Sequence, residues 1–473
     1  MMITVAAALA TIAIVTQDQT ALRAAPRDAA QAQTVLWQGD SLEIRGEKGD
    51  FLQVYDHRHE RAGFVRATQV RVHALTPEAA PELLSVVRFL REANGAETLG
   101  IAYATAYLKA APAAAIDAEP FDALGVMAER LARRASTRQS KAGEVAIAAQ
   151  MEVAANYGVE FVAFERNGQM QTCYNGDAFR RVLGMRADDG QRARAALALT
   201  RHDCVPGTLT PVERAMTDAW RAEVLDRVEL KNLSEVTRNR LHMRKAGVWS
   251  AIAYEKARKA DAALPAATRA IEELAAVNKA ELTEDDAPTY ADAGLRVGAS
   301  RWAAVPEVGM PRGKLALSTT PGQQPGETCV ALQQAEGKAL RTVLTRCTFG
   351  LVWAASAQTS AQGDALALAV QPMATWRELW LFHQRGGEWV VDVLPPAIDN
   401  PDLGYVEFAG WVPGGNQFLA AREVRAEGRY KQSFEVLSQN SLQVERWADR
   451  ANALAAFVRW QDPAWKRGTV SVR

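Results

Sequence analysis

The chain lacks an excess of charge of either sign. Its 473 residues include 55 basic and 55 acidic side chains, so the formal net charge is zero. A protein dedicated to nucleic acid normally carries a basic excess or a concentrated basic stripe, and this class of partner is therefore not expected. Apolar residues make up 48% of the chain and charged residues 23%. These shares are those of ordinary globular proteins and exclude disorder of the whole chain.

Long hydrophobic runs are also scarce. The longest, residues 3–15, lies in an N-terminal stretch of 17 residues without a charged side chain. As a helix it would rise about 20 Å, which is short of a bilayer core of roughly 30 Å. The length suits a signal peptide with a cleavage site at Ala8-Leu9-Ala10, although no basic residue precedes the run. We predict a signal peptide over residues 1–17, a periplasmic or secreted location and no membrane span in the mature chain.

Two alternatives to export remain at this stage. The apolar run is then a buried segment of the fold, or the start of the chain is misassigned and the protein is intracellular. The cysteines bear on this choice, because disulfides persist in oxidising compartments and are rare in the cytosol.

Cysteine is rare, and the four present are Cys173, Cys204, Cys329 and Cys347. An even, small number in an exported chain predicts two disulfides, and proximity in sequence favours Cys173–Cys204 and Cys329–Cys347. These bridges close loops of about 30 and 18 residues, and each contributes about 3 kcal/mol in the chain-entropy model. Four buried free thiols are the alternative. A zinc site is disfavoured because no C-x-x-C or C-x-H pattern occurs.

Motifs that carry catalysis are missing. No G-x-S-x-G, Walker or H-E-x-x-H sequence occurs, and the acidic pairs at Asp188-Asp189 and residues 284–286 fall in polar stretches. We therefore predict no catalytic residue, no metal and no cofactor. The competing hypothesis is a cell-wall hydrolase or another envelope enzyme. It requires the fold to bring His202, His242 or His383 against carboxylates in a cleft.

Short alternating strands are the clearest pattern that is present. Over residues 19–73, Leu42 and Ile44 alternate with polar residues, as do Leu52 and Val54, and glycines punctuate the segment. Period-2 alternation with turns every 6 to 10 positions indicates short antiparallel strands, and a sheet of this size avoids exposed edges by closing into a small barrel. We predict such a barrel over residues 18–74.

This segment resembles the bacterial SH3-like (SH3b) domain. The resemblance rests on ALRAAP at residues 21–26, on Leu42-Glu43-Ile44 after a turn, and on the hairpin ending Arg61-Ala62-Gly63-Phe64-Val65. It covers about 55 of the 473 residues. The resemblance implies an exported or wall-associated protein that binds an envelope protein or a peptidoglycan peptide.

Three aromatic residues of this segment, Trp37, Tyr55 and Phe64, are candidates for a ligand groove. The alternative is that they fill the small core, which we favour for Phe64. The His57-x-His59 pair has the spacing that places two imidazoles on one strand face, but a charged hairpin turn is the expected structure there.

The middle of the chain is predicted to be helical. Apolar residues recur at three- and four-residue spacing from residue 76 to about residue 282. Thr210-Pro211-Val212-Glu213 combines a cap, a proline at the first helical position and a capping-box glutamate. One β-hairpin interrupts the helices, because Asn167-Gly168 separates two apolar runs. Residues 283–312, which contain three prolines, are predicted to be a linker.

Strands are predicted again over residues 313–473. Residues 349–394 align with residues 405–447 at an offset of about 52 to 58 residues. The shared features are Trp353 and Trp411 before a turn, then Gly363-Asp364 and Gly415-Asn416 in the turn. The unit resembles a β-propeller blade of the TolB-like or WD-repeat-like kind, with a third copy beginning at residue 455.

The C-terminal region is too short for a closed propeller. It holds about three blades, whereas a closed ring needs at least four, so an incomplete propeller or a plain antiparallel sheet is expected. Its tryptophans are predicted to pack between sheets, and an exposed subset forming a glycan or peptide platform is the alternative: Trp353, Trp376, Trp380, Trp389, Trp411, Trp447, Trp460 and Trp465.

The sequence therefore predicts a multidomain α+β protein: an SH3-like barrel, an all-α middle domain with one hairpin, and an antiparallel β domain. The expected function is non-enzymatic, with the barrel recognising a peptide or wall element and the other domains serving as a scaffold for partners.

Overall fold

The computed structural model describes residues 11–166, 168–306, 314–337, 339–398, 402–414 and 416–468. The chain forms two compact units, each described here by itself. The first comprises Met1–Leu209 with Arg227–Leu233, and the second Thr210–Asp226 with Ser234–Arg473. The helical region expected as one domain over residues 76–282 is thus divided between the two units.

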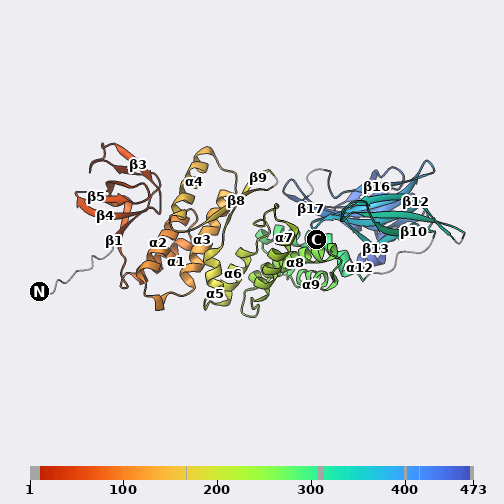
Figure 1. Ribbon diagram of the computed structural model, residues 1–473, viewed down its shortest axis with the longest axis horizontal. Helices are drawn as coiled ribbons and strands as arrows, with labels where there is room; N and C mark the ends of the chain where they lie inside the picture. Colours follow the sequence, from red (N-terminus) through yellow and green to blue (C-terminus); the bar gives the residue numbers. More distant parts are fainter. Residues whose placement is uncertain are drawn as a thin grey trace. The chain divides into compact units, whose positions relative to one another are not determined.

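The first unit begins with a seven-stranded sheet in the order β3-β2-β6-β5-β4-β1-β7. Paired strands are antiparallel, and their inward side chains form one core, so the sheet is strongly curved, as Figure 1 shows. The path runs from β3 to β7 and no closed barrel is formed among the described residues. The elements are β1 (Thr11–Val15), β2 (Thr20–Arg23), β3 (Ala32–Leu36), β4 (Ser41–Lys48), β5 (Phe51–Asp56), β6 (Arg61–Arg66), η1 (Ala67–Gln69) and β7 (Val70–Ala74).

Strand β1 changes the expected N-terminal boundary. Residues 1–10, with the proposed cleavage site, lie outside the described residues, but residues 11–15 pair with both β4 and β7. Ala13 and Val15 face the core of the sheet, and Ile14 packs against the helices. Among the described residues the sheet therefore already includes Thr11–Val15, whereas the sequence predicted a start at residue 18.

Six helices and a hairpin complete the first unit. Helices α1, α2 and α3 pack against one another and against Ile12 and Ile14 of β1. The β8–β9 hairpin predicted at Asn167-Gly168 is present, with Gly168 at a φ of 73° and Asn167 outside the described residues. The elements are α1 (Ala80–Glu92), α2 (Glu97–Ala110), η2 (Ala113–Ala115), α3 (Glu119–Ala135), α4 (Lys141–Ala155), β8 (Phe161–Arg166), β9 (Gln169–Tyr174), α5 (Asp177–Gly184) and α6 (Asp189–Leu199).

The second unit begins with four helices and their short 3₁₀ turns. The predicted capping box is present: Thr210 N–H donates to Glu213 Oε2 (2.9 Å), and Glu213 N–H donates to Thr210 Oγ1 (3.3 Å). The elements are α7 (Pro211–Asp226), α8 (Glu235–Arg258), α9 (Leu264–Ala275), η3 (Lys279–Glu281), η4 (Glu284–Asp286), α10 (Ala287–Ser300) and η5 (Arg301–Ala304). The linker predicted over residues 283–312 is wrong over α10, where Pro288 occupies the first turn. Residues 307–312 lie outside the described residues.

Eleven strands follow and form antiparallel sheets. Strands β10–β12 make a three-stranded sheet, and β13–β20 belong to a larger sheet in which β15 and β17 meet in parallel over two residue pairs. The strands are β10 (Leu315–Pro321), β11 (Thr328–Glu336), β12 (Ala339–Thr348), β13 (Leu351–Thr359), β14 (Ala365–Met373), β15 (Trp376–Arg385), β16 (Glu388–Leu394), β17 (Leu403–Val412), β18 (Gln417–Ala426), β19 (Arg429–Ser438) and β20 (Val444–Ala448).

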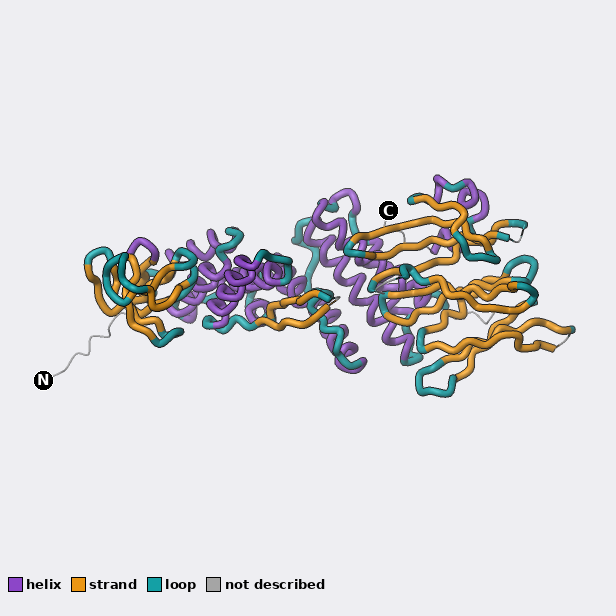
Figure 2. Tube along the Cα trace, turned by 90° about the horizontal axis from the view of Figure 1, so that it is seen from above, coloured by secondary structure: helices purple, strands orange, loops and turns teal. Residues whose placement is uncertain are grey.

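These strands stack in layers, as Figure 2 shows, and the core clusters place β13–β16 between β10–β12 and β17–β20. Leu366 and Leu368 of β14 face the β10–β12 sheet, whereas Ala367 between them faces β17 and β18. Successive side chains of a strand point to opposite faces, so the β13–β16 layer is buried on both sides. Phe457 and Trp465 cover the far face of the β17–β20 layer.

The predicted internal repeat corresponds to two four-stranded meanders, β13–β16 and β17–β20. The turn residue Gly363 precedes β14 as expected, and Gly415 lies outside the described residues. The third copy predicted at residue 455 is wrong, because that segment forms α11 (Ala455–Trp460), after η6 (Ala451–Ala453) and before α12 (Pro463–Gly468). The assignment of these meanders as propeller blades stays a prediction.

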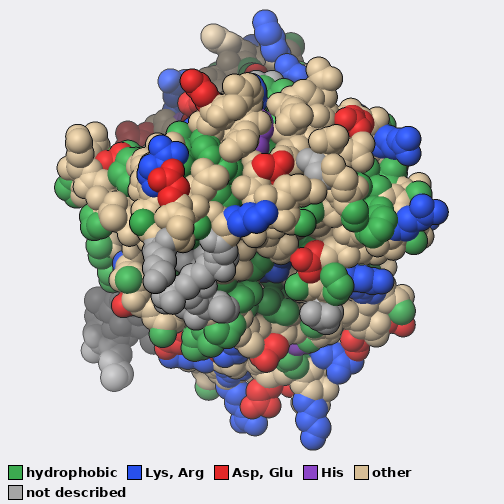
Figure 3. Space-filling view, turned by 90° about the vertical axis from the view of Figure 1, so that its right-hand side faces the viewer, with side chains coloured by type: hydrophobic (Ala, Val, Ile, Leu, Met, Phe, Trp, Pro, Cys, Tyr) green, Lys and Arg blue, Asp and Glu red, His purple; other side chains and the backbone are tan. Residues whose placement is uncertain are grey.

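Charge is evenly distributed on the side of the molecule that bears these sheets. Figure 3 shows basic and acidic side chains spread over this face together, in keeping with the zero net charge of the chain. Within the described part of the chain, no helix is both long and apolar enough to cross a bilayer.

Candidate functional site

Two of the three aromatic candidates lie on one face of the N-terminal sheet. In the β5–β6 ladder Tyr55 pairs with Ala62, and Phe64 pairs with Gln53 two positions along. The neighbouring residues Val54, Gly63 and Val65 point into the core and are buried. Because side chains alternate along a strand, Tyr55 and Phe64 share the outer face, where both are half-buried.

This placement corrects two expectations. Phe64 does not fill the core, because the inward positions of β6 are occupied by Gly63 and Val65. A Cβ at Gly63 would lie 2.7 Å from Cγ of Leu22, so the core has no room for a side chain there. Trp37 lies in the loop after β3, where its backbone N–H donates to Asp40 Oδ2 (2.8 Å), and is not part of the Tyr55–Phe64 face.

A third ring, which the sequence analysis did not single out, belongs to this face. Phe51 is on β5 four residues before Tyr55, with Gln53 between them, and it is only 5% exposed. The three rings therefore surround Gln53, and we call Phe51, Gln53, Tyr55 and Phe64 the outer aromatic face. In the sequence, only the even spacing between Phe51 and Tyr55 indicates that the two side chains share a face of the strand. The alternation of polar and apolar residues does not help here, because four of the first five residues of β5 are apolar or aromatic.

Arginines cover two of the rings. The Arg45 guanidinium carbon lies 4.1 Å from the centroid of Tyr55, and that of Arg66 lies 5.2 Å from the centroid of Phe51. A cation above the ring face is attracted by the ring quadrupole, by about 0.5–1 kcal/mol at exposed sites. The planar guanidinium also leaves donors available for a carboxylate.

Carboxylates hold these arginines and a histidine in place. Glu43 accepts hydrogen bonds from His57 (2.7 Å) and from Arg45 (3.2 Å), and these bonds lower the pKa of Glu43. Arg66 forms a two-point ion pair with Asp28, whose pKa it lowers. The outer aromatic face is thus bordered by two arginine–carboxylate ion pairs, Arg45 with Glu43 and Arg66 with Asp28.

The helices of the first unit pack on the same outer side of the curved sheet, but at strands β1 and β7. There His73 of β7 contacts the hydroxyl of Tyr103 (2.8 Å), and Ile12 and Ile14 of β1 join the helical core. Neither Tyr55 nor Phe64 belongs to that helical core, and both are half-buried.

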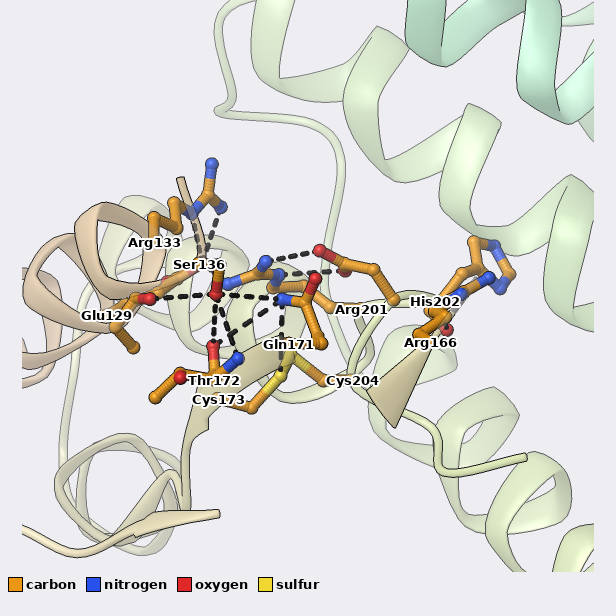
Figure 4. The surroundings of a disulfide bond; sticks show 12 residues. Glu129, Arg133, Ser136, Arg166, Gln171, Thr172, Cys173, Arg201, His202 and Cys204 are labelled. Carbon is orange, nitrogen blue, oxygen red and sulfur yellow. Dashed lines mark hydrogen bonds and ion pairs between the residues drawn. A yellow bond between two sulfur atoms is a disulfide. The ribbon is translucent and has the colours of Figure 1, made fainter. Parts of the chain in front are cut away.

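Both predicted disulfides are present. Cys173–Cys204 joins β9 to the segment after α6, and Cys329–Cys347 joins directly paired residues of β11 and β12. Figure 4 shows the first bridge, beside which Ser136 binds both backbone groups of Thr172. The first bridge fixes the hairpin to the helical core of its unit.

Two of the three candidate histidines contact carboxylates. His383 contacts Asp392 (2.8 Å) and His242 contacts Glu273 (2.7 Å). Neither pair has a serine or cysteine nucleophile at hydrogen-bonding distance among the described residues, and the backbone carbonyl of His202 accepts from Arg166. The carboxylate contact that the enzyme hypothesis requires is thus met at His242 and at His383.

The His57–His59 turn has the expected form. The residues form the β5–β6 turn, and each imidazole meets a different carboxylate, His57 with Glu43 and His59 with Asp56 (2.5 Å). No group of three metal-binding side chains occurs among the residues the structure describes.

The C-terminal tryptophans divide by position. Trp380 packs between two sheet layers as predicted, and Trp376 is buried. Trp465 is buried as well, but it lies on α12 against the outer face of the β17–β20 layer. Trp447 is 65% exposed and Trp460 is 44% exposed.

Comparison of the chain with protein-family models, with curated proteins and with solved structures found no match.

Proposed function

We propose that the protein is a non-enzymatic, exported component of the cell envelope that binds peptides on the outer aromatic face. The likeness to SH3-like domains suggests an envelope protein segment or a peptidoglycan peptide as the ligand. The observation that carries the proposal is the grouping of Tyr55 and Phe64, both half-buried, on the outer face of the sheet and outside the helical core.

The chemistry of the face suits a short peptide that bears a carboxylate. The rings offer apolar contact, Gln53 offers an amide donor and acceptor, and Arg45 offers a guanidinium held above Tyr55. Charge-assisted bonds from arginine to a carboxylate are about twice as strong as neutral ones. The two disulfides support an oxidising compartment, where such bonds persist.

Titration with a synthetic peptidoglycan stem peptide tests the binding proposal, with calorimetry as the readout on the oxidised, full chain. Tyr55→Ala should weaken binding at least about tenfold, a loss of about 1.4 kcal/mol. Because Tyr55 is half-exposed, its removal should leave the fold intact. Trp37→Ala, a ring of the same sheet away from the face, is the matched control and should bind as the wild type does.

Equal effects of Tyr55→Ala and Trp37→Ala would contradict the assignment of this face, and no binding by the wild type would contradict the ligand class. Intact-mass analysis of protein from envelope fractions tests the compartment separately. The expected mass lies about 4 Da below that of the reduced form, because each disulfide removes two hydrogens. Four free thiols would refute export.

A further inference from the structure

A groove of about 560 Å³ lies in the first unit between strand β9 and helix α4. Ser136 and Arg138 form one end, Ile147 and Met151 of α4 form one wall, and Met170 of β9 forms the other. All of these residues belong to the first unit. The groove is remote in sequence from the outer aromatic face and has no part in the function proposed above.

The backbone of β9 faces this groove. Thr172 N–H donates to Ser136 Oγ (2.9 Å), and the Ser136 hydroxyl lies 3.0 Å from the carbonyls of both Thr172 and Ala132, which share its single hydrogen. Both backbone groups of Thr172 therefore point away from β8. In an antiparallel pair this direction alternates along the strand, so the N–H and C=O of Met170 point to the same edge.

Ser136 takes the place of a neighbouring strand at this edge, as Figure 4 shows. Its hydroxyl makes the two hydrogen bonds, one donated and one accepted, that a residue of an added strand would make to Thr172. At Met170 no such substitute exists: within the described residues no partner outside the hairpin binds its backbone. At this edge of β9, the backbone groups of Thr172 have a hydrogen-bond partner, whereas the outward backbone groups of Met170 are available to an added strand.

The side chains around the open position are apolar and adaptable. Met170 is 56% exposed, Met151 is half-buried, and both line the groove with Ile147. Methionine is unbranched and polarisable, and it accommodates partner side chains of different shape. Arg138 is exposed at one end and forms no ion pair with another described residue, and the exposed Glu144 of α4 also lines the groove.

We propose that β9 binds an extended segment of a partner protein by strand addition, with Met170 supplying the backbone hydrogen bonds. The segment carries an apolar side chain toward Ile147 and Met151 and an acidic side chain toward Arg138. In this mode of recognition the main chain gives affinity and the pockets for alternate side chains give specificity.

The probe is a synthetic eight-residue peptide of alternating valine and threonine that ends in two glutamates. The protein is labelled with ¹³C at its 10 methionine methyl groups and titrated by NMR. Saturable shifts are expected at Met151 and Met170, with the other methionines unchanged. The same peptide methylated at alternate backbone nitrogens cannot complete a ladder, and it should bind at least about tenfold more weakly because backbone hydrogen bonds are lost.

A proline exchange isolates the backbone of β9. Met170→Pro removes the outward N–H and no hydrogen bond of the hairpin, and it should abolish the shifts at Met151. Glu165→Pro is the matched control: Glu165 is paired with Met170 and directs its N–H to the opposite edge, so this variant should bind as the wild type does.

Three results would overturn the proposal. The first is no change in the methionine methyl shifts with millimolar peptide. The second is equal affinity of the methylated and unmethylated peptides. The third is an equal loss of peptide binding in Met170→Pro and Glu165→Pro. A second pair of variants distinguishes blocking from unfolding. Ala148→Trp fills the groove from an exposed position of α4 and should abolish binding, whereas Ala142→Trp lies on the same helix outside the groove and should not.

Discussion

Replacing Glu407 by glutamine should destabilise the second unit strongly. Glu407 accepts hydrogen bonds from Arg301 Nε (2.8 Å) and Nη2 (2.5 Å), and it also forms an ion pair with Arg377. The three side chains are buried, with exposed fractions of 1%, 7% and 0% for Glu407, Arg301 and Arg377. One carboxylate thus neutralises two guanidinium groups in the interior.

The magnitude follows from the asymmetry of buried ion pairs. Removal of one partner leaves the other charge uncompensated in the interior, which costs about 3–5 kcal/mol. In Glu407→Gln two guanidinium groups lose their counter-ion, but the amide oxygen still accepts one hydrogen bond. The expected loss in the free energy of unfolding is therefore about 3 kcal/mol. Glu336→Gln is the matched control, because Glu336 forms an exposed pair with Arg341 and such pairs contribute about 0–1 kcal/mol.

The loss should depend on pH. Burial opposes the ionisation of Glu407, but Arg301 and Arg377 outweigh burial and hold its pKa below the ordinary value. A carboxyl whose pKa is lower in the folded state stabilises the fold above its unfolded pKa of about 4.3. This stabilisation disappears as the pH falls through the lower, folded-state value. The difference between wild type and Glu407→Gln should hence be full at pH 7 and shrink below about pH 4.

Urea unfolding followed by tryptophan fluorescence measures this difference. Every tryptophan except Trp37 belongs to the second unit, so the signal reports on the unit that contains Glu407. A difference below about 1 kcal/mol at pH 7 would refute the reasoning, since it would place the triad in the range of exposed pairs. A difference that persists unchanged at low pH would show that loss of charge is not its cause.

Three further predictions concern packing, hydrogen bonding and redox chemistry. Gly63→Ala should destabilise the first unit by about 1–3 kcal/mol through overpacking against Leu22, measured by thermal unfolding, whereas Gly184→Ala, with nothing within 4 Å of its Cβ position, should not. Ser136→Ala should cost about 1–3 kcal/mol at the β8–β9 hairpin and accelerate amide exchange there, because Thr172 loses its partner for both backbone groups. Mild treatment with a thiol should reduce Cys329–Cys347, in which Cys347 is exposed, before Cys173–Cys204, in which Cys173 is buried. Alkylation followed by peptide mass analysis measures the order of reduction. The reverse order would show that burial does not govern reduction.

The sequence predicted a structural feature correctly where the residues that form it lie close together in the chain. Thr210 and Glu213 form the predicted capping box, and the four cysteines pair as proximity suggested. The prediction from the sequence was wrong where the same residue pattern is compatible with two different structures. Three prolines suggested a linker, yet Pro288 lies in the first turn of α10, where its missing N–H costs no hydrogen bond.

The candidate face shows the same limit. Strand β5 has apolar or aromatic residues on both of its faces: Phe51, Leu52, Val54 and Tyr55. Its own sequence therefore does not show which of the two alternating sets of side chains points into the core. The decision comes from the paired strand. Gly63 stands opposite Val54 and is pressed against Leu22, which fixes the inward parity and directs Tyr55 outward. Register between strands is a property of the tertiary structure and is only weakly encoded in one strand.

The apolar run at the N-terminus was ambiguous in the same way, because part of it forms strand β1. A strand that is buried on both faces appears in sequence as a continuous apolar run and not as an alternation. Ala13 and Val15 face the sheet core and Ile12 and Ile14 face the helices, so the second half of the apolar run has a structural cause independent of export. Cleavage after Ala10 would leave β1 in the sheet, whereas cleavage after residue 17 would remove a strand that joins β4 to β7. The N-terminal sequence of the mature protein should therefore begin no later than Thr11, and a start at residue 18 would contradict the role of β1 in the fold.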